Sequence, residues 1–144
     1  MKRLVFFGLF AALLVGACSQ SSPTGPSQVN VPYSAVDLRV GTGAEAGMGR
    51  LATVNYTGWL YNTQGVDNKG QQFDSSLSPG RTPFQFTVGQ GVIQGFSMGV
   101  NGMKAGGLRR VTIPPSLGYG SQGSGTAIPP NATLIFEIEL VSVP

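Results

Sequence analysis

The chain has 144 residues, of which 41% are hydrophobic and 10% charged, so it is long and apolar enough to form one domain with a substantial core. It contains no histidine and a single cysteine, which excludes histidine acid–base catalysis, Ser-His-Asp triads, histidine metal sites and an internal disulfide. The formal net charge is +3. Lys2 and Arg3 supply two of these charges from a segment expected to be cleaved, so the mature chain is nearly neutral and no nucleic-acid binding is expected.

The first 18 residues resemble the export signal of a bacterial lipoprotein. Residues 1–3 include two basic side chains, and residues 4–14 form an apolar run that is shorter than the roughly 20 residues needed to cross a bilayer. Small residues at 15–17 precede Cys18, as in a lipobox. The resemblance implies a signal peptide at 1–17 and lipidation of Cys18. Several acyl chains on that residue would give stable anchoring. An ordinary secretory signal followed by an incidental cysteine is the alternative.

Residues 18–32 are predicted to be the lipidated cysteine and a flexible tether. They are rich in Ser, Pro, Gln and Gly and show no apolar periodicity. Ser19 follows the cysteine, and resemblance to lipoproteins without an Asp at this position implies sorting to the outer membrane. We therefore expect a protein of the bacterial cell envelope, lipid-anchored at the outer membrane and facing the periplasm, with a folded domain at 33–144.

The first half of this domain is patterned as strands. Apolar residues alternate with polar ones at 36–40, which predicts a half-buried strand. A longer strand is predicted at 51–60, followed by a polar loop at 61–70. Extended structure resumes at 71–75, and after a Pro-Gly turn the residues at 84–88 alternate again.

The period changes in the second half. Ile93, Phe96, Val100 and Met103 are spaced as on one face of a helix, and three glycines nearby limit this prediction to a single short helix. Strands are then predicted at 108–113 and 133–141, the latter with Leu134, Phe136, Ile138 and Leu140 facing inward. The fold class is α+β: an antiparallel sheet of five or six strands wrapped around one short helix.

Aromatic residues recur near the predicted turns, and two interpretations are open. Each ring taken alone fits a core position, but together the rings could line an apolar hollow at one end of the helix. Asp74 directly follows Phe73 on a strand. Its carboxylate is either exposed or held by hydrogen bonds from donors such as Tyr56 or Arg81.

Five stretches of the domain resemble the FKBP family of peptidyl-prolyl cis-trans isomerases, in the family's order. The match covers about residues 36–143, so it includes nearly all of the predicted domain. The five stretches are VNYTG at 54–58, QFDSS at 72–76, PFQF at 83–86, VIQGF at 92–96 and the long run at 117–140 that contains LGYG and IPPNATLIFEIEL.

The resemblance implies an enzyme that rotates Xaa-Pro peptide bonds. Its catalytic residues would be Tyr56, Asp74, Tyr119 and Phe136, with Asp74 facing the reacting amide and the Tyr119 hydroxyl bonding a ligand carbonyl. The backbone N–H of Ile93 would bond another carbonyl. The implied substrate-binding residues are Phe73, Phe84, Val92, Ile93, Phe96 and Ile128.

Two positions depart from the family's pattern. Phe96 stands where many members have Trp, which keeps an apolar pocket floor but removes the indole N–H. Ser124 stands where the best-known members have His.

The expected partners are proline-containing polypeptides and macrolide inhibitors, with no metal or cofactor, and a monomer is expected. The expected role is to accelerate protein folding outside the cytoplasm, through desolvation and stabilisation of a twisted amide in an aromatic pocket. A non-catalytic peptide-binding or chaperone module on the cell envelope is the alternative function.

Overall fold

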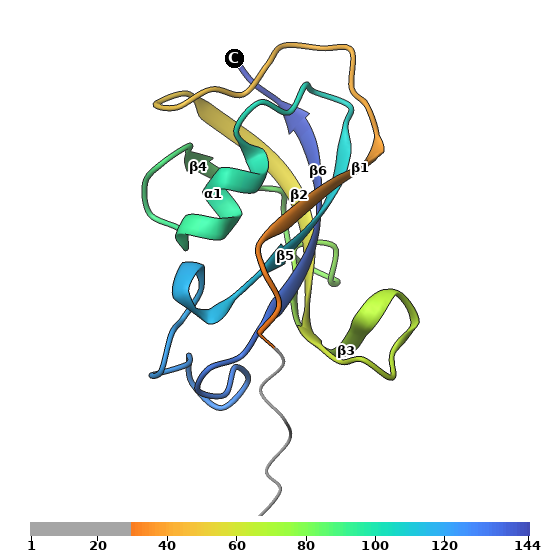
Figure 1. Cartoon of the computed structure of the whole chain (residues 1–144). Helices are drawn as coiled ribbons and strands as arrows, with labels where there is room; N and C mark the ends of the chain where they lie inside the picture. Colours follow the sequence, from red (N-terminus) through yellow and green to blue (C-terminus); the bar gives the residue numbers. More distant parts are fainter. Residues whose placement is uncertain (1–29) are drawn as a thin grey trace, which may run out of the picture.

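A curved antiparallel sheet and one short helix form the part of the chain that the computed structural model describes, residues 30–144 (Figure 1). The predicted signal peptide, Cys18 and nearly all of the predicted tether lie outside the described residues. No helix within residues 30–144 is long and apolar enough to cross a membrane. The elements are β1 (Ser34–Arg39), β2 (Leu51–Tyr61), the 3-10 turn η1 (Val66–Asn68), β3 (Lys69–Ser75), β4 (Phe84–Thr87), α1 (Gln94–Val100), β5 (Leu108–Ile113), the 3-10 turn η2 (Pro115–Leu117) and β6 (Leu134–Ser142).

The sheet has the strand order β1-β5-β6-β2-β3, and β4 pairs with β2 beside this path. Every pair is antiparallel. The long central pair β2–β6 sets the register, with Gly58 opposite Phe136 and Tyr56 opposite Ile138. Helix α1 lies against one face of the curved sheet (Figure 1). The predicted α+β class, with a sheet wrapped around one short helix, is therefore confirmed.

Alternation along β6 places the core between the sheet and the helix. Its side chains at 134, 136, 138 and 140 are at most 4% exposed, whereas Glu137 and Glu139 point to the other face, called here the outer face of the sheet. On the helix side, Phe96, Val100 and Met103 are buried against the sheet, as the helical spacing predicted.

Two of the glycines that weaken the helical pattern allow the helix to approach the sheet. A Cβ at Gly95 would lie 2.5 Å from Cγ2 of Ile113, and one at Gly99 would lie 2.6 Å from Cγ2 of Val111. Both distances are shorter than van der Waals contact. The cost of glycine in a helix is therefore offset by close packing of α1 on β5.

Strand β1 forms where it was predicted, but the prediction that it is half-buried is wrong. All six of its residues are exposed, and the apolar Val36 and Leu38 are 56% and 42% exposed. The reason is its place in the sheet: β1 is an edge strand that pairs only with β5. Val36 lies opposite Arg110, on the outer face, where no layer of described residues covers it.

Charged side chains on the outer face are paired with one another. Arg110 binds Oε1 of Glu137 and Oδ2 of Asp67, both at 2.9 Å, and Lys69 Nζ lies 2.6 Å from the same Glu137 oxygen. Burial raises the pKa of Glu137, but the hydrogen bonds and positive charges of Lys69 and Arg110 outweigh it, so the pKa is lowered overall. This Arg110 cluster (Asp67, Lys69, Arg110 and Glu137) ties the start of β3 to β5 and β6.

Candidate active site

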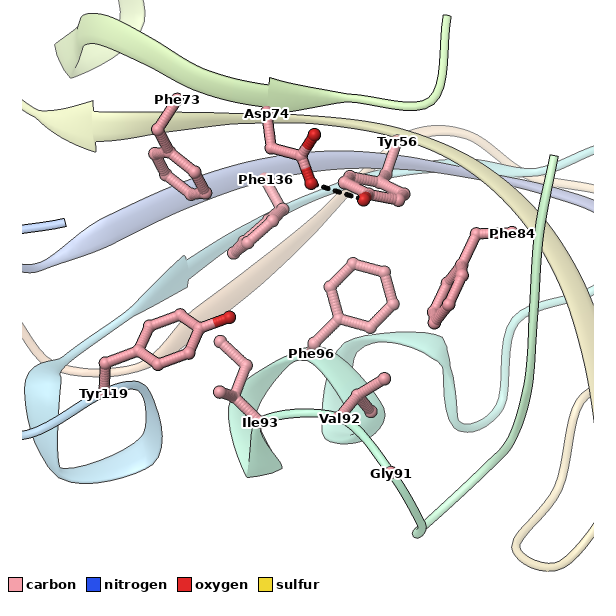
Figure 2. Close-up of a pocket in the computed structure, with 10 residues that line it drawn as sticks. All are labelled: Tyr56, Phe73, Asp74, Phe84, Gly91, Val92, Ile93, Phe96, Tyr119 and Phe136. Atoms are coloured by element: carbon pink, nitrogen blue, oxygen red, sulfur yellow. Dashed lines mark hydrogen bonds between the residues drawn. The ribbon is translucent and has the colours of Figure 1, made fainter. Parts of the chain in front are cut away.

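A cavity of about 190 Å³ opens between the inner face of the sheet and the N-terminal end of α1 (Figure 2). Strands β2, β3, β4 and β6 each contribute side chains to it, as do the β4–α1 connection, the first turn of α1 and the loop after η2. Its lining residues are Tyr56, Phe73, Asp74, Phe84, Gly91, Val92, Ile93, Phe96, Tyr119 and Phe136.

Aromatic rings form the floor and walls of this pocket. Phe96 lies at the floor, edge-to-face with Phe136 at 5.2 Å and with Tyr56 at 5.6 Å between ring centroids. Phe73 meets Phe136 edge-to-face at 5.4 Å. Such contacts fix the orientation of rings as well as burying them. The sequence patterns left core and hollow as alternatives, and the structure shows that these rings do both.

Gly58 gives two of these rings their space. A Cβ at this position would lie 2.6 Å from Cζ of Phe73 and 2.8 Å from Cε1 of Phe136. Gly58 pairs with Asp74 on one side and Phe136 on the other, so its missing side chain lies directly behind the aromatic wall.

The Asp74 carboxylate lies at the edge of the pocket and is held at both oxygens. The hydroxyl of Tyr56 donates to Oδ2 at 2.6 Å, and the backbone N–H of Ser75 donates to Oδ1 at 2.9 Å. Arg81 Nη1 also reaches Oδ1, at 3.4 Å. Both donors considered from the sequence therefore bind it. The Asp74 side chain nevertheless remains 39% exposed, so its charge can act on a bound peptide.

Both tyrosines of the pocket are protonated donors at neutral pH. Burial raises the pKa of Tyr56 to about 12, with the hydrogen bond to Asp74 and its negative charge adding to the shift. Burial and the charge of Asp74 also raise the pKa of Tyr119. The Tyr119 hydroxyl points toward the centre of the pocket in Figure 2, where it can donate to a ligand oxygen.

The β4–α1 connection brings backbone to the pocket. The carbonyl of Ile93 accepts hydrogen bonds from the N–H groups of Phe96 and Ser97, at 3.1 and 3.2 Å. The N–H of Ile93 has no acceptor among residues 30–144, so it is available to a ligand carbonyl. Within the same part of the chain, no group of three His, Cys, Asp or Glu side chains is placed to hold a metal ion.

Nine of the ten residues predicted for the site in this domain line the pocket, and Ile128 does not. Ile128 is only 6% exposed and packs in the core, where its backbone N–H and C=O both bond Ser124. Gly91 lines the pocket but was missed, because a glycine contributes backbone and carries no side-chain signal. Cys18, the predicted lipidation site, lies outside the described residues.

The pocket has aromatic walls and hydrogen-bonding groups at its rim, and none of its lining residues is Ser, Thr, Cys or Lys. Such a site suits the binding of a compact apolar ring attached to peptide carbonyl groups, which is the chemistry of a prolyl residue.

Comparison with known proteins identifies the family. The family model for FKBP-type peptidyl-prolyl cis-trans isomerases matches residues 43–141. An FK506-binding protein of Neisseria meningitidis serogroup A is 52% identical over 108 residues, which cover 74% of this chain and 92% of the relative. FK506-binding protein 2 of Dictyostelium discoideum is 42% identical over 144 residues and 99% of both chains.

Solved structures agree with this result. AtFKBP13 superimposes with a TM-score of 0.66 and 35% identity over 78% of this chain and 93% of that one. FkpA from Escherichia coli superimposes with a TM-score of 0.65 and 36% identity over 77% of this chain and 47% of that one. The chain belongs to the FKBP-type peptidyl-prolyl cis-trans isomerase family.

Proposed function

We propose that this isomerase receives a prolyl ring in its aromatic pocket and stabilises the twisted state of the preceding amide. The observation that supports this most strongly is Asp74, whose carboxylate is fixed by Tyr56 and Arg81 at the rim of an otherwise apolar hollow. The planar and twisted states of an amide differ in polarity, so a fixed charge beside apolar walls stabilises them to different extents. This mechanism breaks no covalent bond and needs no nucleophile.

The energy to be supplied is the resonance of the amide. Rotation has a barrier of about 18–20 kcal/mol, and the planar amide carries more separated charge than the twisted one. A water-poor aromatic pocket therefore disfavours the planar state relative to water. The Ile93 N–H and the Tyr119 hydroxyl would bind carbonyls on either side of the rotating bond in a geometry that only the twisted state offers. Each 1.36 kcal/mol of such selective stabilisation gives about a tenfold faster rate.

We further propose that the enzyme accelerates the folding of proline-containing proteins outside the cytoplasm. The support is the lipobox-like series that ends at Cys18, followed by the Ser- and Pro-rich residues 19–32. On this proposal the domain at 33–144 is lipid-anchored at the outer membrane of a bacterial cell and faces the periplasm, as a monomer. Several relatives are named for binding FK506, and we propose that the pocket also binds this macrolide.

A coupled isomerisation assay on a Phe-Pro peptide tests the catalytic proposal. Phe136→Ala and Asp74→Ala should each lower kcat/KM by at least about tenfold, whereas Asp37→Ala, which removes an aspartate on β1 outside the pocket, should leave it unchanged. Peptide binding without acceleration by the wild-type protein would instead support a non-catalytic binding or chaperone module.

Mass spectrometry of detergent-extracted protein tests the anchor separately. The proposal expects a triacylated N-terminal Cys18, and Cys18→Ala should release the protein from membranes. An unmodified Cys18 would overturn the anchor and leave the catalytic proposal intact.

A further inference from the structure

The segment between β4 and α1 has a shape on which the pocket depends. Residues 88–93 form a tight turn that supplies Gly91, Val92 and Ile93 to the pocket lining. Gly89 and Gly91 have φ of +97° and +72°, values that few other residues adopt. A change in the path of this turn would therefore move the free N–H of Ile93 and the Val92 side chain together.

Ser97 holds this turn at both ends. It is the middle residue of α1, directly after the pocket floor Phe96, and is 6% exposed. Its Oγ accepts the backbone N–H of Gly89 at 2.6 Å, and its own N–H donates to the carbonyl of Ile93 at 3.2 Å. Among the described residues, no other side chain hydrogen-bonds to the backbone of 88–93.

The other hydrogen bonds of the turn are between backbone groups, and one of them closes it, because the N–H of Gln90 donates to the carbonyl of Thr87 at 2.9 Å. The N–H of Val88 donates to Arg50, and its carbonyl accepts from Gly49, each at 2.9 Å. The bond from Gly49 holds the carbonyl side of the Val88–Gly89 peptide, and the Ser97 hydroxyl holds its N–H side. Gly89 is an exposed residue, and the Ser97 hydroxyl is the acceptor that its N–H has among the described residues, so removing the hydroxyl leaves this N–H to solvent and removes one bond that holds the turn.

We infer that Ser97 is a positioning residue of the active site, which links the floor of the pocket to the turn that presents the Ile93 N–H. This inference rests on the proposed function, in which that N–H binds a substrate carbonyl. Ser97 does not line the pocket. It therefore acts indirectly, by setting the position of the turn that contacts bound substrate.

The test compares Ser97→Ala with a conservative and a matched variant. Ser97→Ala should lower kcat/KM on the Phe-Pro peptide by about tenfold, mainly through a higher KM. Ser97→Thr keeps a hydroxyl and should recover most of the loss. Val100→Ala, in the same helix, removes buried core volume away from the turn and should lower the thermal midpoint with little change in KM. A Ser97→Ala enzyme with wild-type KM, or a loss of activity that simply follows stability as in Val100→Ala, would overturn the inference.

Amide hydrogen exchange gives a readout that does not require catalysis. In Ser97→Ala the Gly89 amide should exchange about tenfold faster or more, while amides of the central strands keep their wild-type rates. If the wild-type protein proves inactive on peptides, the proposed function fails, and the exchange rate of Gly89 still decides the role of Ser97. An unchanged Gly89 rate would show that the hydroxyl does not hold the turn.

Discussion

The Tyr56 hydroxyl combines burial with a short hydrogen bond to a carboxylate, and this combination has a measurable pH signature. Its pKa is about 12 in the folded protein against 10.0 for an ordinary tyrosine. Because the folded value is the higher one, the stabilisation is fully present below pH 10 and is lost as pH rises toward 12. In a titration followed by tyrosinate absorbance, we expect one of the four tyrosines to ionise near pH 12. Tyr56→Phe should remove that step, and its persistence in this variant would contradict the assignment to Tyr56.

Gly58 leaves a space behind the aromatic wall that a side chain could fill only by moving the rings. In Gly58→Ala the added methyl group would push the rings of Phe73 and Phe136 into the pocket. Overpacking of this kind costs about 1–3 kcal/mol, so we expect lower stability together with at least about a tenfold fall in kcat/KM. Gly47→Ala is the matched control, because a Cβ there would approach nothing closer than 4.0 Å. Wild-type activity in Gly58→Ala would contradict the assigned role of this glycine.

At individual positions, the sequence predicted which side chains gather in the pocket better than it predicted their partners. Bulky aromatic residues leave a pattern in the chain, whereas Gly91 contributes only backbone and leaves none. Arg81 and Asp74 are seven residues apart across a turn, and the turn's path decides whether they meet. Ile128 belongs to a motif that also occurs in the family's pocket, yet in this chain it packs in the core.

The close contact between α1 and β5 leaves no room for a side chain at Gly99. Alanine is a better helix former than glycine by about 1 kcal/mol, but a Cβ at Gly99 would overlap with Val111. We expect Gly99→Ala to lower the free energy of unfolding by about 1–2 kcal/mol overall. Denaturant unfolding of Gly99→Ala, Val111→Ala and the double variant checks this. The cycle should show that shortening Val111 recovers part of the loss, and a Gly99→Ala protein more stable than wild type would be the opposite result.

Two strands with the same alternating pattern differ in how well that pattern predicted their burial. In β6 the alternation of apolar residues with Glu137 and Glu139 corresponds directly to an inner and an outer face. The same alternation in β1 belongs to a fully exposed edge strand, because period two identifies a strand without saying what covers it. Place in the sheet depends on pairing between distant segments, which local patterns do not encode.

Across the whole molecule, charge is absent from the segments that build most of the pocket. Residues 82–103 and 111–136 contain no Lys, Arg, Asp or Glu, and they supply seven of the ten lining residues. Among residues 30–144, the only charges at the pocket are those of Asp74, which lines it, and its partner Arg81. We therefore expect kcat/KM on an uncharged peptide to change less than about twofold between roughly 0.01 M and 1 M salt, a range over which the Debye length falls about tenfold. A steep salt dependence would point to substrate recognition by charges elsewhere on the surface.

Acid should weaken the outer face of the sheet, because it protonates Glu137 in the Arg110 cluster. The folded pKa of Glu137 lies below its ordinary 4.5, so its stabilisation is present above pH 4.5 and is lost as pH falls through the lowered value. Thermal unfolding between neutral pH and about pH 3 should show a decline that is smaller in Glu137→Gln than in wild type. Glu45→Gln, which changes a glutamate that forms no ion pair among the described residues, should retain the wild-type decline. An equal decline in Glu137→Gln would remove this glutamate as its source.

Strand β1 is the first element after residues 30–33, it pairs only with β5, and it contributes nothing to the pocket. A mechanical pull on the chain from its N-terminal side would therefore reach the six residues of β1 first. The pocket is lined by residues of β2, β3, β4, α1 and β6 and of two connecting loops, and none of them belongs to β1. If the proposed lipid anchor were placed under load, β1, which contributes nothing to the pocket, would be the first strand to carry the force.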